Sequence, residues 1–305
     1  MSSETFGKVL ESGSCGLKFE KSSFGNSRSL EDGQIEGIAN LFGADSDSIS
    51  SRKSLISRKI KAVKKVTAVL GKARKFWISC TLPYPDAGVR LIKRSKVDWF
   101  IEKMTEIRGE LSEAVSEMDD ARDEIIEEAR VRLSGLFDES QYPSSFSESY
   151  SIKWSFPSLQ PPEWMKELNP AAYEAEVAKV KAQFEVAVVQ AEEAFKSQLV
   201  KIIADLKDKL SGKASDGKLR ADSFKTLQKF VESYKELNIG SSVELDSIVA
   251  DAAKLIDPSL KGTDAIQAVA NQFAEIHENL DKMIVKSGTR KMVLSDGDED
   301  DNVAA

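Results

Sequence analysis

The chain of 305 residues carries a formal net charge of −7, with 41% hydrophobic and 30% charged residues. This composition allows a sizeable core and is typical of a soluble, helix-rich protein. No apolar run approaches the roughly 18 residues that a membrane span needs. The N-terminus shows no secretion signal, so we expect a protein of the bacterial or host-cell cytoplasm.

Few side chains of the chain suit catalysis or metal binding. The two cysteines, Cys15 and Cys80, give neither a disulfide framework nor a zinc-ligand spacing. The single histidine, His277, lies in "QFAEIHENLDKMI", which has the periodicity of an amphipathic helix. Without an acid, base and nucleophile that could act together, the sequence predicts no catalytic residue, no cofactor and no metal ion.

Residues 1–50 are rich in serine and glycine and hold few large apolar side chains. Only "QIEGIANLF" (34–42) has the spacing of a short helix. We therefore expect a flexible N-terminal arm over 1–50.

Residues 51–94 are expected to form a basic helix followed by a short β-hairpin. Apolar residues recur at helical spacing over 52–75. "FWISCTL" (76–82) and "VRLI" (89–92) are rich in β-branched and aromatic residues, and "PYPDAG" between them supplies a turn.

The strongest charge asymmetry falls in the same region. Ten Lys/Arg and no Asp/Glu lie between Ser48 and Pro85, so the rest of the chain carries −17. The basic candidates for contacts with nucleic acid or an acidic partner are Lys61, Lys64, Lys65, Lys72, Arg74 and Lys75. These side chains could hold a phosphate backbone, pair with acidic residues of the same assembly, or remain a solvated face.

Two long helices are predicted within 95–212. The first runs from about Lys96 to Phe137, with an apolar seam and an acidic outer face. The second begins at Asn169–Pro170, a good N-cap and first-turn pair, and carries a comparable seam to Leu210. Two seams of equal length predict a long antiparallel helical hairpin.

The connection between these helices, 138–169, is expected to be a folded tip with a small β element. Aromatic and apolar side chains alternate from Tyr150 to Phe156, as on a strand with one apolar face. Packing onto the end of the hairpin and docking of a partner are both open for this tip. Its candidate docking residues are Tyr142, Trp154, Phe156 and Trp164.

The C-terminal part, 219–287, predicts three shorter helices at 221–237, 242–256 and 263–286. With residues 1–93, these helices are expected to form a helical base. Residues 288–305 end in "SDGDEDDNVAA" and predict an acidic, disordered tail. The fold class expected is therefore mainly α, with a small β element.

The stretch "EEARVRLSGLFDESQYPSSFSESYSIKWSF" (127–156) resembles the centre of the uncharacterised domain-of-unknown-function family 3150. The residues that carry the resemblance are Arg132, Leu133, Gly135, Leu136, Phe137, Asp138, Tyr142, Pro143, Ser144 and Trp154. "LPYPDAGVRLI" (82–92) is similar to the segment before the family's long helix, and the resemblance covers roughly 50–210.

The resemblance implies a phage, plasmid or bacterial product, often encoded beside MoxR-type AAA ATPases and von Willebrand factor A proteins. It implies no catalytic residues. We expect a non-enzymatic helical interaction protein, an adaptor or assembly component whose protein partners are an AAA ATPase or a second copy of itself. The alternative is a nucleic-acid-associated phage or plasmid factor that binds through 52–77.

Overall fold

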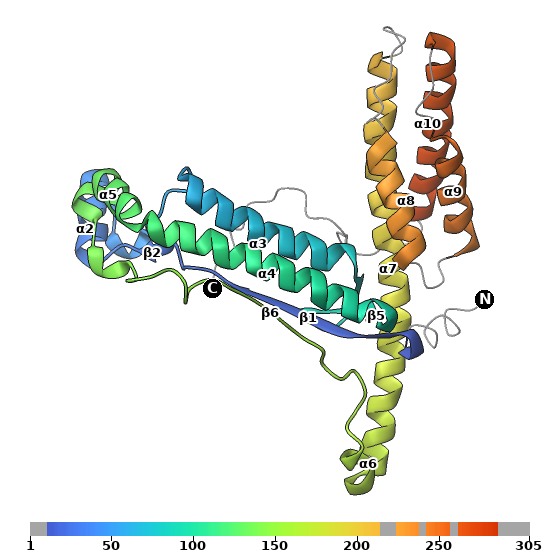
Figure 1. Ribbon diagram of the computed structural model, residues 1–305, viewed down its shortest axis with the longest axis horizontal. Coiled ribbons are helices and arrows are strands. Elements are labelled where there is room, and N and C mark those ends of the chain that lie inside the picture. The colour runs from blue at the N-terminus through green and yellow to red at the C-terminus, as the bar shows by residue number, and fades with distance from the viewer. Residues whose placement is uncertain (1–10, 214–223, 238–241, 257–261, 286–305) are drawn as a thin grey trace. The chain divides into compact units, whose positions relative to one another are not determined.

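A computed structural model describes residues 11–213, 224–237, 242–256 and 262–285 (Figure 1). The described chain is mainly helical with a small antiparallel sheet, which confirms the fold class. It divides into two compact units: unit 1 comprises 1–18, 75–98 and 155–305, and unit 2 comprises 19–74 and 99–154. None of the helices in the described ranges is long and apolar enough to cross a bilayer.

Unit 2 is built around two helices and their extensions. Helix α3 spans Lys61–Ser79 and α4 spans Val97–Asp120; residues up to 74 and from 99 belong to this unit. The apolar seam of α4 is buried as its spacing predicts: Phe100, Met104, Ile107, Leu111, Ala114, Val115 and Met118. Helix α5 spans Arg122–Leu133, and the 3₁₀ turn η3 (Ser134–Leu136) follows it.

The single helix expected over Lys96–Phe137 is therefore two helices that meet at Ala121. This residue has φ −88° and ψ 8°, outside the helical range. The buried positions continue beyond Ala121 with Ile125, Ile126 and Ala129. The Arg122 side chain there donates to the carbonyl oxygen of Pro143 over 2.9 Å.

The expectation of a flexible arm is wrong for the described residues from Glu11 to Ser50. Strand β1 spans Ser14–Ser22, β2 spans Ser27–Ser29, and helix α2 spans Asp32–Phe42. Cys15, Leu17 and Phe19 alternate with polar residues along β1, and Leu17 is fully buried. This alternation has the period of a strand, although it is short and surrounded by serine.

The sheet has the order β4-β5-β1-β6. The first half of β1 pairs antiparallel with β5 (Val89–Lys93), with Ser14 opposite Lys93 and Lys18 opposite Val89. The second half of β1 lies in unit 2 with most of β6 (Ser151–Ser155), where the Ser22 and Ser151 hydroxyls are 2.8 Å apart. A separate antiparallel pair joins β2 to β3 (Arg52–Ser54).

The predicted strand at 76–82 is wrong over its first four residues, which form the last turn of α3. Ile78 is buried in this turn, so packing of the helix outweighs the β propensity of this aromatic stretch. Strand β4 is only Leu82–Pro83 and pairs with β5, with Leu82 opposite Leu91. The hairpin itself is confirmed, with a shorter first strand.

The core of unit 1 surrounds helix α7 (Pro170–Lys213). Asn169 caps this helix as predicted, since its side-chain oxygen accepts from the Ala172 N–H over 3.1 Å. The α7 seam packs with α8 (Lys225–Leu237), α9 (Val243–Lys254) and α10 (Thr263–Val285) in one buried cluster. Figure 1 shows α8 and α10 running beside the second half of α7.

The antiparallel hairpin of the two long helices is not confirmed. The buried cluster that contains the α7 seam takes its other members from β4, β5 and the C-terminal helices. The segment 138–169 is also not a single tip, because 138–154 belongs to unit 2 and 155–169 to unit 1. The acidic tail expected over 288–305 lies outside the described residues.

Aromatic packing supplies a direct test of the unit 1 core. Phe273 of α10 is 0% exposed and its ring centroid lies 6.3 Å from that of Phe224. We expect Phe273→Ala to lower the free energy of unfolding by about 3–5 kcal/mol, because it leaves a cavity. Urea denaturation followed by circular dichroism measures this loss.

The matched control is Val243→Ala at the start of α9, where the side chain is 80% exposed. Its effect should stay within about 0.5 kcal/mol. Equal losses in the two variants would contradict this description of the core.

Candidate functional site

The basic segment forms a lysine stripe along α3. At about 100° per residue, Lys61, Lys64, Lys65, Lys72 and Lys75 fall within an arc of roughly 100°, and all five are exposed. We call these five residues the lysine stripe. Arg74 is half-buried and lies off this face, so it does not belong to the stripe.

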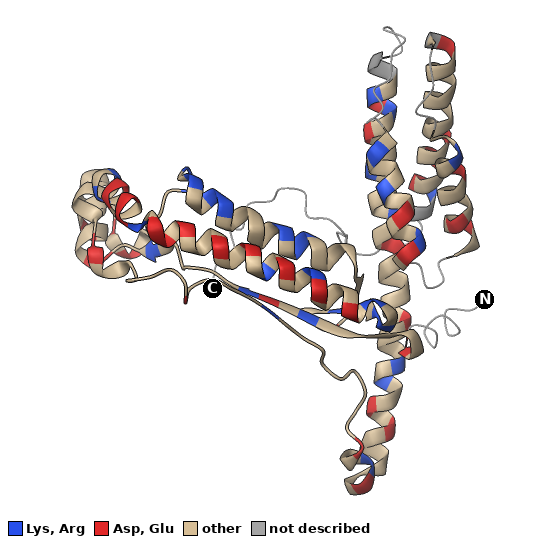
Figure 2. Cartoon of the chain, in the orientation of Figure 1, with Lys and Arg blue, Asp and Glu red and all other residues tan. Residues whose placement is uncertain are grey.

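Two members of the stripe pair with acidic residues of α4. Lys65 Nζ lies 2.5 Å from Glu117 Oε1, and Lys72 Nζ lies 2.7 Å from both Glu110 oxygens. A step of seven residues along α3 matches a step of seven in the opposite direction along α4, so the helices are antiparallel. Figure 2 shows this basic helix beside the acidic one.

Intramolecular pairing is therefore confirmed for Lys65 and Lys72. Both pairs are about half exposed, so each contributes at most about 1 kcal/mol. The side chains of Lys61, Lys64 and Lys75 make no hydrogen bond or ion pair with any residue in the described part of the chain. These three lysines are the part of the stripe that remains open to a partner.

The four candidate docking residues of the tip separate into two kinds. Tyr142 is 6% exposed, its ring stacks on Phe137, and its hydroxyl donates to the Leu55 carbonyl over 2.8 Å. Trp154 is half-buried, with its ring centroid 6.2 Å from that of Phe100. Tyr142 is thus buried within unit 2, while Phe156 and Trp164 are exposed and stay candidates for docking.

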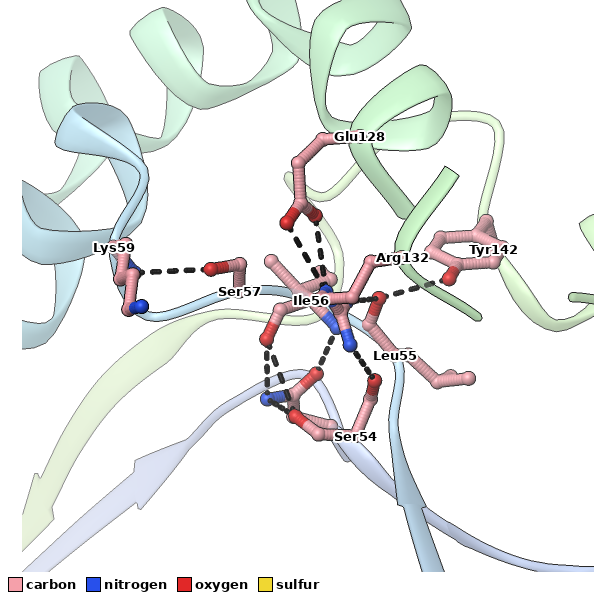
Figure 3. Close-up of polar contacts among 9 residues, drawn as sticks. Ser54, Leu55, Ile56, Ser57, Lys59, Glu128, Arg132 and Tyr142 are labelled. Atoms are coloured by element: carbon pink, nitrogen blue, oxygen red, sulfur yellow. Dashed lines mark hydrogen bonds and ion pairs between the residues drawn. The ribbon is translucent and has the colours of Figure 1, made fainter. Parts of the chain in front are cut away.

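Arg132 lies at the centre of a polar network in unit 2 (Figure 3). In the sequence, this residue stood out only as part of a family motif. Its Nη1 donates to the Ser54 carbonyl over 2.9 Å and its Nη2 to the Leu55 carbonyl over 2.8 Å. Its Nε faces Glu128, one helical turn earlier, at 3.1 Å. The guanidinium thus fixes α5 to the chain that follows β3.

Asn26 completes this network from the other side. Its Oδ1 accepts from the Ile56 N–H, and its Nδ2 donates to the Ile56 carbonyl over 2.9 Å and to the Ser54 hydroxyl over 2.9 Å. The Asn26 amide therefore makes the two hydrogen bonds that a neighbouring strand would otherwise make with the Ile56 backbone. Lys53 is buried nearby and donates to the Leu136 carbonyl over 2.7 Å.

A second network fixes the loop before β6 to the end of α4. Asp119 accepts from the Phe146 N–H at 2.5 Å and from the Ser145 and Ser147 hydroxyls at 2.7 Å each. Desolvation alone would raise the pKa of the Asp119 carboxyl, but these hydrogen bonds outweigh it and hold the pKa below its usual value. The carboxylate form is thus the one that orders the loop.

The reactive side chains noted in the sequence have ordinary surroundings. His277 Nδ1 lies 3.0 Å from Asp281 Oδ2, one turn along α10. Cys80 is a buried free thiol whose pKa is raised to about 12 by desolvation, so it is a poor nucleophile at neutral pH. Among the residues that the structure describes, no group of His, Cys, Asp and Glu is arranged to hold a metal ion.

Comparisons with protein-family models, curated proteins and solved structures found no match. The resemblance to family 3150 therefore stays a prediction. Its motif residues Arg132 and Tyr142 both bond to the Leu55 carbonyl, and Trp154 packs on α4. In this chain those residues stabilise the fold.

The Arg132 network predicts a difference between two neighbouring arginines. Arg132→Lys should lower the free energy of unfolding of unit 2 by about 1–3 kcal/mol, because one ammonium cannot reach both carbonyls and Glu128. Thermal and urea denaturation measure the loss. The control is Arg130→Lys on the same helix, whose partners Glu127 and Glu139 are mostly exposed. A control as damaging as Arg132→Lys would contradict the assigned role.

The Asp119 network predicts a pH-dependent contribution to stability. Because the folded-state pKa is depressed below the unfolded value of about 3.9, the contribution is fully present above that value and lost as the pH falls through the folded pKa. We therefore expect Asp119→Asn to lower the unfolding midpoint at pH 7. Its difference from the natural chain should narrow below about pH 5. A constant difference from pH 7 to pH 3 would argue against this account.

Proposed function

We propose that the protein is a non-enzymatic interaction component of a multiprotein assembly that contacts protein partners through helix α6 (Trp164–Leu168). The observation that supports this proposal is an exposed apolar pair on α6. Trp164 is 59% exposed and Leu168, four residues later on the same helical face, is 77% exposed. We call these two residues the α6 pair.

Exposing large apolar side chains to water is unfavourable in free energy. Burying a leucine side chain contributes about 2 kcal/mol, and tryptophan is among the residues that contribute most to protein interfaces. A partner that covers the α6 pair would recover this free energy. Phe156, also exposed, lies eight residues earlier in the same unit.

Helix α6 is also held in a defined position. The Met165 N–H donates to the Pro162 carbonyl over 3.0 Å, and the Asn169 N–H donates to the Met165 carbonyl over 2.8 Å. Asn169 in turn caps α7, against which α6 packs. An ordered apolar pair loses little conformational entropy on binding.

Unit 2 carries a second exposed apolar pair, at the end of α2. Leu41 and Phe42 are both more than three-quarters exposed, and Gly43, with φ +64°, ends the helix directly after them. Ala39 is the single residue of α2 that is fully buried. This helix adds a further surface for assembly contacts.

The partner that the family resemblance implies is a MoxR-type AAA ATPase in the bacterial or host-cell cytoplasm, with a second copy of the chain as the other possibility. An adaptor needs contact surfaces and no catalytic centre. The α6 pair meets that requirement by itself.

Nucleic-acid binding through 52–77 is the second candidate function. Three lysines of the stripe, Lys61, Lys64 and Lys75, are exposed and unpaired within the described residues, which favours it. Against it, Glu110 and Glu117 lie beside the stripe and would repel a phosphate backbone.

The double variant Trp164→Ser/Leu168→Ser tests the assembly function. We expect its thermal midpoint to stay near that of the natural chain, because both side chains are exposed, while its partners are lost. Pull-down from the native host with quantitative mass spectrometry measures partner recovery. Size exclusion with light scattering shows whether the lost partner is a second copy.

The matched control is Val243→Ser, which also removes an exposed apolar side chain from unit 1 and should keep every partner. Full recovery of partners by the double variant would contradict the proposal. Retention of duplex or single-stranded nucleic acid on nitrocellulose at about 50 mM salt, lost in Lys61→Gln/Lys64→Gln/Lys75→Gln, would favour the second candidate.

A further inference from the structure

A pocket in unit 2 lies between α4 and the segment that leads into β6. Its volume is about 330 Å³, and all of its lining residues come from 108–115 and 147–153. This volume falls at the lower end of the range for small-molecule sites. The apolar part of the lining is Leu111, Val115 and Ile152, each of which is buried.

Four polar side chains line the same pocket without a hydrogen-bonding or ionic partner. Within the described ranges, Arg108, Ser112, Tyr150 and Lys153 make no hydrogen bond and no ion pair. Elsewhere in unit 2, Lys65, Lys72 and Arg132 have carboxylate partners, while the unpaired Lys61 and Lys64 lie on the exposed face of α3 and line no part of this pocket. The gathering of unpartnered polar groups at one hollow is what distinguishes this pocket.

The other polar groups of the lining are already used. The Ser147 hydroxyl donates to Asp119, and the Ser151 hydroxyl bonds to that of Ser22. The Asp119 carboxylate of α4 bonds to this lining, and three donors from the loop 145–147 already satisfy it. It therefore has little capacity left to compete for Arg108 or Lys153.

All four unpartnered side chains can donate hydrogen bonds. Arginine and lysine can only donate. Burial raises the pKa of the Tyr150 hydroxyl to about 12, so the phenol keeps its proton at neutral pH. The Arg108 guanidinium lies 5.0 Å from the centroid of the Trp154 ring, which orients it.

We propose that this pocket binds a small organic anion, a carboxylate or a phosphate monoester carried on an apolar body. Arg108 and Lys153 meet the negative charge at the rim. Ser112 and Tyr150 donate to its oxygens. Leu111, Val115 and Ile152 cover the apolar body. This site is independent of the α6 pair and of the assembly function.

Isothermal titration calorimetry of the full chain with phenyl phosphate and with benzoate tests the site. We expect at least one of these anions to bind with a Kd on the order of 1 mM, as for a fragment-sized ligand in a half-open pocket. Phenyl phosphate alone would assign a phosphate monoester, benzoate alone a carboxylate, and both would show recognition of the charge itself. Uncharged benzyl alcohol and inorganic phosphate should bind at least tenfold more weakly.

Charge-removing variants locate the binding. Arg108→Gln and Lys153→Gln should each weaken the binding of the anion about tenfold, and Tyr150→Phe about threefold. The matched control, Lys64→Gln, removes the same charge from another exposed position of unit 2 and should change nothing. The Lys153 side chain makes no hydrogen bond or ion pair with the described residues, so its variant remains informative where Arg108→Gln loses stability through Trp154.

Three results would overturn the proposal. The first is no heat of binding with either anion at about 10 mM. The second is benzyl alcohol or inorganic phosphate binding as tightly as the aromatic anion. The third is equal affinity in the natural chain, Lys153→Gln and Lys64→Gln, which would show binding outside the pocket.

Discussion

The buried backbone at residues 55 and 56 is the constraint on which unit 2 depends. Leu55 and Ile56 are almost fully buried, so their carbonyl oxygens must find donors inside the protein. Arg132 and Tyr142 supply donors to Leu55, and Asn26 supplies one to Ile56. Leaving such a carbonyl unsatisfied costs about 1–3 kcal/mol. Three segments distant in sequence are therefore fixed to one short stretch that has little regular structure of its own.

Periodicity identified the helices because each buries one face. The seams of α4 and α7 and the three C-terminal helices follow from apolar spacing alone. The same signal says nothing about what covers a face, and the two long seams look alike in sequence. The periodicity therefore could not show that the two long helices pack against each other as a hairpin. The partners of α7 come from 224–280 and from β4 and β5, and none of them from the seam of α4.

Local propensity misled in two places for different reasons. Phe76, Trp77 and Ile78 favour a strand by type, but they form the last turn of α3, where Ile78 is buried, and tertiary packing decided the outcome. The segment before Ser50 looked unstructured because serine dominates it, yet the short alternation in β1 was readable. The site residues Asn26 and Arg132 were beyond prediction as a pair. Their partners are main-chain carbonyls and amides, which carry no signature in the residue type.

The lysine stripe shows how much about function can be inferred from a charge pattern in the sequence. The charge asymmetry between 48–85 and the rest of the chain left nucleic-acid binding, pairing with acidic residues and a solvated face all open, and in the structure Lys65 and Lys72 pair with α4. Each pair removes one cation from those that a polyanion can use. Three unpaired lysines would release about three counterions from a duplex, whereas strong binders make about 6–10 phosphate contacts. The electrostatics of α3 and α4 therefore favour the assembly function, because a partly neutralised stripe has little capacity to hold nucleic acid at physiological salt.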